Sequence, residues 1–217
     1  MARAGGGRLL DYGCGDGTFV AMVHEGFSET RGVDVEPGQI AGCRERLGHL
    51  PGVSFGMTGD FGPSDSGAWT VVTCMEVLEH CLEPERRRII GELGRLCAID
   101  GLVVISVPIE TGPSLAGKQF FRAVAGVRGL GDYAHRERYT PLEMLRATAG
   151  RAVPRVVYEG EGATGRFSYY GHKGFEWRDV QREIEARMRV ERRTFSPLPW
   201  AGSALNSQVW FICRHST

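Results

Sequence analysis

The sequence predicts a doubly wound α/β fold with a mostly parallel, seven-stranded sheet that ends in an antiparallel C-terminal hairpin. Between Arg8 and Val107, short β-type runs alternate with helical stretches in five successive units. This alternation is typical of parallel strands joined by right-handed crossovers. Towards the C-terminus, two further β-type runs, Val190–Phe195 and Ser207–Cys213, are joined by a loop that contains proline. These two runs predict the closing hairpin.

The first half of the sheet is read from three β-type runs. Arg8–Tyr12 is the first strand, and the helical run Thr18–Glu25 follows it after a glycine-rich turn. The second and third strands are expected at Arg31–Val35 and Val53–Met57. Pro37 lies between them and suits the first position of the connecting helix.

Two more strands complete the parallel part. Thr70–Cys74 is continuously apolar, as expected for a strand that is buried on both faces. Pro84 begins a helix whose apolar residues keep helical spacing. Leu102–Val107 is then the fifth strand, and Pro108 ends it.

A long segment interrupts the alternation of strands and helices after the fifth strand. Residues 109–173 are rich in glycine and aromatic residues, with helices expected at Lys118–Val127 and Pro141–Ala149. Phe175–Met188 has helical spacing again. Because no repeat or linker separates these parts, we expect residues 1–217 to form one domain, with residues 109–173 as a substrate lid inserted into it.

The composition restricts the class of partner. Lysine plus arginine equals aspartate plus glutamate, so the formal net charge of the 217 residues is zero. Nucleic-acid partners usually require a basic excess, so we expect a small-molecule substrate instead. The six cysteines form no C-x-x-C pair, which favours a reducing compartment. No stretch is long and apolar enough to span a membrane. We therefore expect a cytoplasmic monomer or homodimer.

The strongest motif is the turn after the first strand, LLDYGCGDGT. Glycines allow positive φ and a close ligand approach, and the following helix N-terminus offers free N–H groups. The spacing is G-x-G-x-G, which differs from the dinucleotide fingerprint G-x-G-x-x-G. Asp11, just before the turn, would repel a pyrophosphate but suits the ammonium of a methionine tail.

Acidic residues also follow the next two strands. In a doubly wound sheet, a carboxylate at the position of Asp34 lies beside a ribose and accepts from its hydroxyls. The alternative is that Asp34 caps the helix that Pro37 begins. Asp60 and Phe61, after the third strand, suit the amino group and the ring of adenine.

Together with the segment TCMEVLEHC, these motifs resemble class I S-adenosylmethionine-dependent methyltransferases. Within that superfamily, the branch of ubiquinone-biosynthesis O-methyltransferases and natural-product tailoring enzymes is most similar. The resemblance implies S-adenosylmethionine as the cofactor and S-adenosylhomocysteine as its product. The residues that it places at the cofactor are Asp11, Gly13, Cys14, Gly15, Gly17, Asp34, Val35, Asp60, Phe61, Cys74, Met75 and Glu76. Relatives usually carry one or two helices before the first strand, whereas seven residues precede it here.

A hydroxyl acceptor needs a general base, and histidine is the natural choice near neutral pH. His135, ahead of the Pro141 helix, is our first expectation. His172 and His80 are the alternatives, and for all three a structural role stays open.

Glu76, Glu79 and His80 form an E-x-x-E-H set. On a helix these three side chains would share a face and could converge on a divalent ion. Some similar quinone-pathway and RNA enzymes use such a set, but many relatives with the same letters do not. We expect no metal here.

The sequence therefore predicts a methyltransferase that methylates a phenol, quinol or sugar hydroxyl of a small secondary metabolite. Two alternatives stay open: a metal-assisted RNA 2′-O-methyltransferase, and a catalytically idle protein that binds the cofactor.

Overall fold

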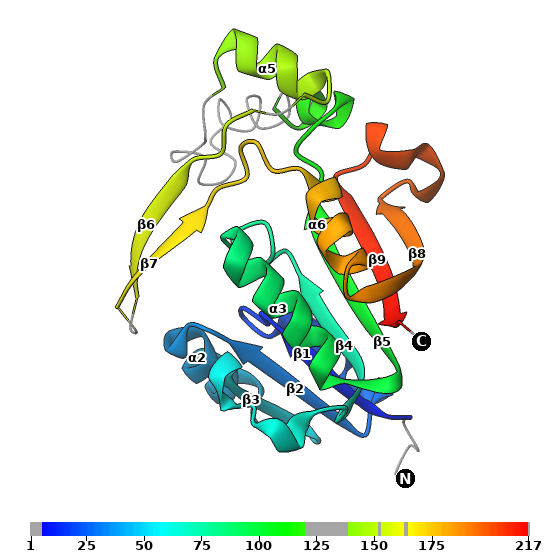
Figure 1. Ribbon diagram of the computed structural model, residues 1–217. Coiled ribbons are helices and arrows are strands. Elements are labelled where there is room, and N and C mark those ends of the chain that lie inside the picture. The colour runs from blue at the N-terminus through cyan, green and yellow to red at the C-terminus, as the bar shows by residue number, and fades with distance from the viewer. Residues whose placement is uncertain (1–5, 120–138, 152, 163–164, 217) are drawn as a thin grey trace.

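The computed structural model of this chain describes residues 6–119, 139–151, 153–162 and 165–216. Its centre is a seven-stranded sheet in the order β3-β2-β1-β4-β5-β9-β8 (Figure 1). The first five strands are parallel, while β9 is antiparallel to both β5 and β8. The doubly wound fold with a closing hairpin is thus confirmed.

The strands of this sheet are β1 (Arg8–Tyr12), β2 (Glu29–Asp34), β3 (Val53–Met57), β4 (Trp69–Met75), β5 (Cys97–Pro108), β8 (Met188–Ser196) and β9 (Gln208–His215). The helices are α1 (Thr18–Val23), α2 (Pro37–Leu47), α3 (Glu83–Leu96), α5 (Pro141–Thr148) and α6 (Trp177–Glu185). Short 3-10 turns follow at His24–Gly26, Thr58–Asp60, Pro63–Asp65 and Pro199–Ala204.

The core forms where the sheet meets α3 and α6. Leu10, Val72 and Ile105 of three adjacent strands are fully buried together with Leu93 of α3 and Val180 of α6. Burial on both faces explains why the central strands are continuously apolar. This packing fixes the carboxyl ends of the parallel strands at one edge, where ligands of such folds bind.

Two elements differ most from their predicted bounds. β5 begins five positions before Leu102, at Cys97, because the chain pairs with β4 there before it bulges. The helix predicted over Phe175–Met188 is shorter, since Met188 already belongs to β8. Residues 113–119 are helical, and the rest of the predicted Lys118–Val127 helix lies outside the described residues.

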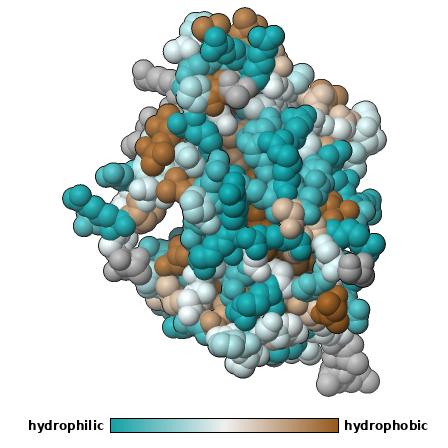
Figure 2. All heavy atoms as spheres, viewed as in Figure 1, coloured by the Kyte–Doolittle hydropathy of each residue, from teal (hydrophilic) through white to brown (hydrophobic). Residues whose placement is uncertain are grey.

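The segment between β5 and α6 contains an element that the sequence did not predict. β6 (Val157–Gly162) and β7 (Gly165–Tyr170) pair as a separate antiparallel hairpin. Figure 1 shows this hairpin as an arm that reaches from the α3 side towards α2, and in Figure 2 it stands off the rest of the molecule. No helix in the described part of the chain is long and apolar enough to cross a membrane.

Candidate active site

The glycine turn after β1 is shaped by three positive φ angles, 86° at Gly13, 51° at Gly15 and 76° at Gly17. A Cβ at Gly13 would come within 2.4 Å of Val77, and one at Gly17 within 2.8 Å of Leu47. A Cβ at Gly15 would meet nothing within 4 Å. Two glycines are therefore required by packing, while Gly15 turns an open backbone surface outwards. Such a surface fits a ligand that approaches the backbone.

Asp34, at the end of β2, holds this turn in place. Its Oδ2 accepts a hydrogen bond from Gly15 N at 3.0 Å, and its Oδ1 accepts from Glu36 N at 3.0 Å. The α2 helix is capped by Glu36, whose carboxylate accepts from Gly38 N. The carboxylate of Asp34 is thus directed at the glycine turn, and the helix has its own cap.

Asp11 is almost completely buried at the end of β1, with 2% of its surface exposed. Thr73 donates a hydrogen bond of 2.7 Å to its Oδ1. Burial raises the pKa of Asp11 to about 6, against the opposing effect of the Thr73 hydroxyl. A partly protonated carboxyl in this position ionises fully once a cation is placed beside it.

The residues predicted for adenine lie after β3. One oxygen of Asp60 accepts from Met57 N at 2.8 Å and pairs with Arg31 at 3.4 Å. The same guanidinium lies 5.1 Å from the centre of the Phe61 ring. Val35, predicted at the ribose, is 66% exposed next to Asp34.

The backbone is strained at Glu76, directly after β4, a position called here the mouth of β4. Glu76 is the one non-glycine residue with positive φ, 55°, in the part of the chain that the structure describes. Its carboxylate accepts a hydrogen bond of 3.1 Å from Ser106 of β5, and burial raises its pKa. Residues in such conformations cost free energy and cluster at functional sites. Cys74, one residue before Met75, is fully buried in the core.

Two buried carboxylates lie behind this mouth. Glu79 has no exposed surface, and burial together with Glu76 raises its pKa to about 8. Glu110, which follows β5, is also buried and pairs with Lys118 at 3.0 Å. Lys118 also donates to the Ile109 carbonyl at 2.8 Å. At neutral pH this cluster therefore contains a protonated Glu79 and a paired Glu110.

Two of the predicted histidines meet in front of these carboxylates. The rings of His80 and His172 pack edge to face with centroids 4.8 Å apart. His80 Nδ1 lies 3.0 Å from the Tyr170 carbonyl, and its Nε2 lies 3.8 Å from Glu79. His172 Nδ1 lies 4.0 Å from Glu110. His135, the first expectation, lies outside the described residues.

The E-x-x-E-H set is not helical, which corrects the sequence prediction. Residues 76–82 form turns, and α3 begins at Glu83. Pro84 has no N–H to bond the His80 carbonyl, so a helix cannot run back through this segment. That carbonyl instead accepts from Tyr170 N at 2.9 Å. Among the described residues, no three His, Cys, Asp or Glu side chains are placed to share a metal ion.

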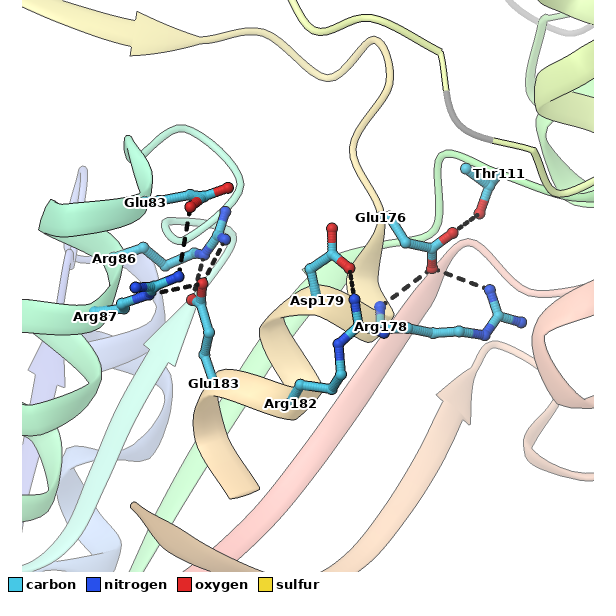
Figure 3. Close-up of polar contacts among 9 residues, drawn as sticks. All are labelled: Glu83, Arg86, Arg87, Thr111, Glu176, Arg178, Asp179, Arg182 and Glu183. Carbon is cyan, nitrogen blue, oxygen red and sulfur yellow. Dashed lines mark hydrogen bonds and ion pairs between the residues drawn. The ribbon is translucent and has the colours of Figure 1, made fainter. Parts of the chain in front are cut away.

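A hollow of about 490 Å³ lies elsewhere, between α3 and α6. Figure 3 shows that its charged side chains bond one another: Glu183 accepts from Arg86 and Arg87, and Asp179 pairs with Arg182. The pairs of Glu183 with Arg86 and Arg87 join α6 to α3, whereas the Asp179–Arg182 pair lies within α6. Figure 3 also shows Glu176 accepting from Thr111, a contact of 3.3 Å that ties together the two ends of the inserted segment. The hollow is therefore structural, and the strand ends remain the candidate site.

The glycine turn, the acidic strand ends and the sheet order define a nucleotide-type site in a methyltransferase fold. Residues 2–150 match the family described as "Methyltransferase domain". The chain belongs to this family. No curated protein sequence matches it significantly.

Solved structures share the fold at low identity. The PH0226 protein from Pyrococcus horikoshii is 16% identical with a TM-score of 0.63, over 97% of this chain and 82% of that one. A TehB-like SAM-dependent methyltransferase from Corynebacterium glutamicum is 14% identical with a TM-score of 0.57, over 97% and 81%. The N-methyltransferase NodS from Bradyrhizobium japonicum, solved with S-adenosylhomocysteine, is 13% identical with a TM-score of 0.55, over 97% and 78%.

Proposed function

We propose that this methyltransferase uses S-adenosylmethionine to methylate a hydroxyl group of a small molecule. The observation that supports a hydroxyl acceptor is the His80–His172 pair. It lies near Glu76, where the backbone is strained directly after β4. The family and the donor named for several structural neighbours support the cofactor.

The described residues fit this cofactor at the glycine turn. The open backbone at Gly15 would receive the methionine part, with Asp11 facing its ammonium. Asp34 and Val35 would lie at the ribose, and Asp60 with Phe61 at the adenine. When bound, the cofactor supplies an activated methyl group on a sulfonium, so the protein must mainly orient the acceptor and accept its proton.

We propose that His172 and His80 accept that proton. An imidazole exchanges protons near neutral pH, and general-base catalysis contributes about 10²–10⁴-fold. His172 faces the carboxylate of Glu110, which would stabilise the imidazolium that forms. His80 is held by the Tyr170 carbonyl and orients the ring of His172. His135 remains a proposed alternative base.

A small acceptor is favoured over RNA by the pairing of the basic residues. The arginines of the Arg86–Arg88 run bond Glu183, Glu83 and Glu85. Paired arginines on a chain with zero net charge leave little attraction for a phosphate backbone. We propose that residues 109–173 cover the acceptor as a lid.

All six cysteines are free, which supports a cytoplasmic location.

An amine acceptor is the second candidate. The half-buried carboxylate of Glu76, directly after β4, would attract a cation, and NodS is an N-methyltransferase.

Turnover with a matched panel separates these candidates. The purified protein is incubated with S-adenosylmethionine and phenols, quinols, sugars, the corresponding amines, or RNA, and S-adenosylhomocysteine is quantified. We expect product with hydroxyl acceptors. Product with amines alone would assign N-methylation, and product with RNA alone would contradict a small acceptor. Binding without turnover on any acceptor would support the idle alternative.

A further inference from the structure

The β6–β7 hairpin lies close to two loops that follow strands of the main sheet, and a hydrogen bond joins it to one of them. At its root, Tyr170 N donates to the His80 carbonyl at 2.9 Å. Near its far end, the position of a Cβ on Gly162 lies 3.3 Å from Glu36 Oε2. His80 follows β4 and Glu36 follows β2, and β1 lies between these strands in the sheet. The hairpin therefore crosses the end of β1, where the glycine turn begins.

The length of the hairpin agrees with this path. A six-residue strand extends over about 20 Å. The distance across two strand spacings, from β4 to β2, is about 10 Å. The hairpin is thus long enough to cover the turn after β1 and the end of β2 together.

The two faces of the hairpin are chemically different. The face that it shares with Gly162 carries three aromatic rings, in which Tyr169 lies 5.6 Å from Tyr158 and 5.7 Å from Phe167 between centroids. The opposite face carries Val157 and Tyr170 at the root of the hairpin and four exposed polar residues beyond them, which are Glu159, Glu161, Arg166 and Ser168. Because Gly162 points at Glu36, the aromatic face is the one directed at the body of the protein.

Phe167 lies at the Glu36 end of this face. Its Cε1 is 3.3 Å from the same Gly162 Cβ position that Glu36 Oε2 approaches, so ring and carboxylate are neighbours. The ring also covers Gly160, where a Cβ would come within 2.7 Å of it. Even so, Phe167 is 49% exposed. This uncovered aromatic surface lies beside the residues that follow β2 and is available to pack against a ligand there.

We propose that this aromatic face, with Phe167 at its end, covers the adenosine half of the cofactor. The inference rests on the proposed donor, and it concerns residues beyond the 2–150 family match. Burial of the exposed part of the Phe167 ring against the ribose and adenine slows the escape of the ligand.

Binding kinetics of S-adenosylhomocysteine test this assignment. Phe167→Ala is compared with Arg166→Ala, which removes a neighbouring side chain from the opposite face. Loss of an aromatic contact is expected to raise the Kd about ten-fold, mainly through faster dissociation. The control should bind as the wild type does. 5′-Methylthioadenosine, which lacks the amino-acid part, should lose the same factor.

A second variant moves the hairpin without removing the ring. In Gly162→Val the branched side chain meets Glu36 and Phe167, and dissociation should again be faster. An unchanged dissociation rate in both Phe167→Ala and Gly162→Val would show that the hairpin does not cover the adenosine. The assignment of S-adenosylmethionine as the methyl donor would still stand. If the wild type does not bind S-adenosylhomocysteine at all, the donor itself is wrong. Thermal unfolding of the ligand-free variants shows that the domain is folded in each case.

Discussion

The imidazole rings of His80 and His172 meet edge to face with centroids 4.8 Å apart, although one follows β4 and the other follows the β6–β7 hairpin. The hydrogen bonds between His80 and Tyr170 bring them together. Each ring has a buried carboxyl group beside it, Glu79 for His80 and Glu110 for His172. This arrangement would give the proposed acceptor site a base that is already oriented.

The first prediction concerns this pair. His172→Ala should lower kcat at least about a hundred-fold for a hydroxyl acceptor and leave the Kd of the cofactor unchanged, because the ring acts on the acceptor. His24→Ala is the control, since His24 bonds only the nearby Ala21 carbonyl among the contacts described. A loss below ten-fold, together with a large loss in His135→Ala, would move the base to His135.

The second prediction concerns Asp34. Its carboxylate holds Gly15 N and is proposed to receive the ribose, so Asp34→Ala should weaken binding of S-adenosylhomocysteine about ten- to a hundred-fold. Asp34→Asn keeps the shape and removes the charge, and it should fall between. Calorimetry gives the affinities. An unchanged affinity, with a lower melting temperature, would assign Asp34 a purely structural role.

The third prediction follows from the buried Glu79. Burial raises its pKa to about 8 in the folded protein, against an ordinary value of 4.5. The folded state therefore holds a proton that the unfolded state releases between these pH values, so the free energy of unfolding falls as pH rises through that window. Glu79→Gln stays neutral and should gain stability relative to the wild type from pH 5 to about pH 8. Urea unfolding at several pH values measures this, and parallel pH profiles would show that Glu79 ionises normally.

The fourth prediction concerns the ion pair between Arg86 of α3 and Glu183 of α6 (Figure 3). Arg86 is 4% exposed and bonds Glu183 through two nitrogens at 2.6 and 2.8 Å. Breaking a buried pair costs about 3–5 kcal/mol, and Arg87 still contacts Glu183 in the variant. The free energy of unfolding of Arg86→Ala should therefore be about 3 kcal/mol lower than that of the wild type. The exposed pair Arg88–Glu85 is the matched control. The free energy of unfolding of Arg88→Ala should fall by less than about 1 kcal/mol. Equal losses would show that burial is not decisive here.

Much of the fold was predictable because its signals are local. Apolar strands such as Thr70–Cys74, prolines at helix starts and the spacing of Gly13, Gly15 and Gly17 each determine nearby structure. The hairpin was missed because Val157–Gly162 alternates glycine and glutamate, both depleted in strands. Its connection also lacks the Asn-Gly signal of tight turns.

The proposed acceptor side of the site depends on tertiary contacts that the sequence does not display. The helical interpretation of Glu76–His80 was wrong because Pro84 cannot bond the His80 carbonyl. That carbonyl is then available to Tyr170, and this contact brings His172 to the site. Without the hairpin, no spacing rule connects the two histidines.

The central claim is that the glycine turn binds S-adenosylmethionine. Calorimetric titration of the purified wild-type protein with S-adenosylhomocysteine, and separately with NAD, tests it most directly. We predict saturable binding of S-adenosylhomocysteine and a higher melting temperature in its presence, with no binding of NAD. Binding of NAD without binding of S-adenosylhomocysteine would contradict the account.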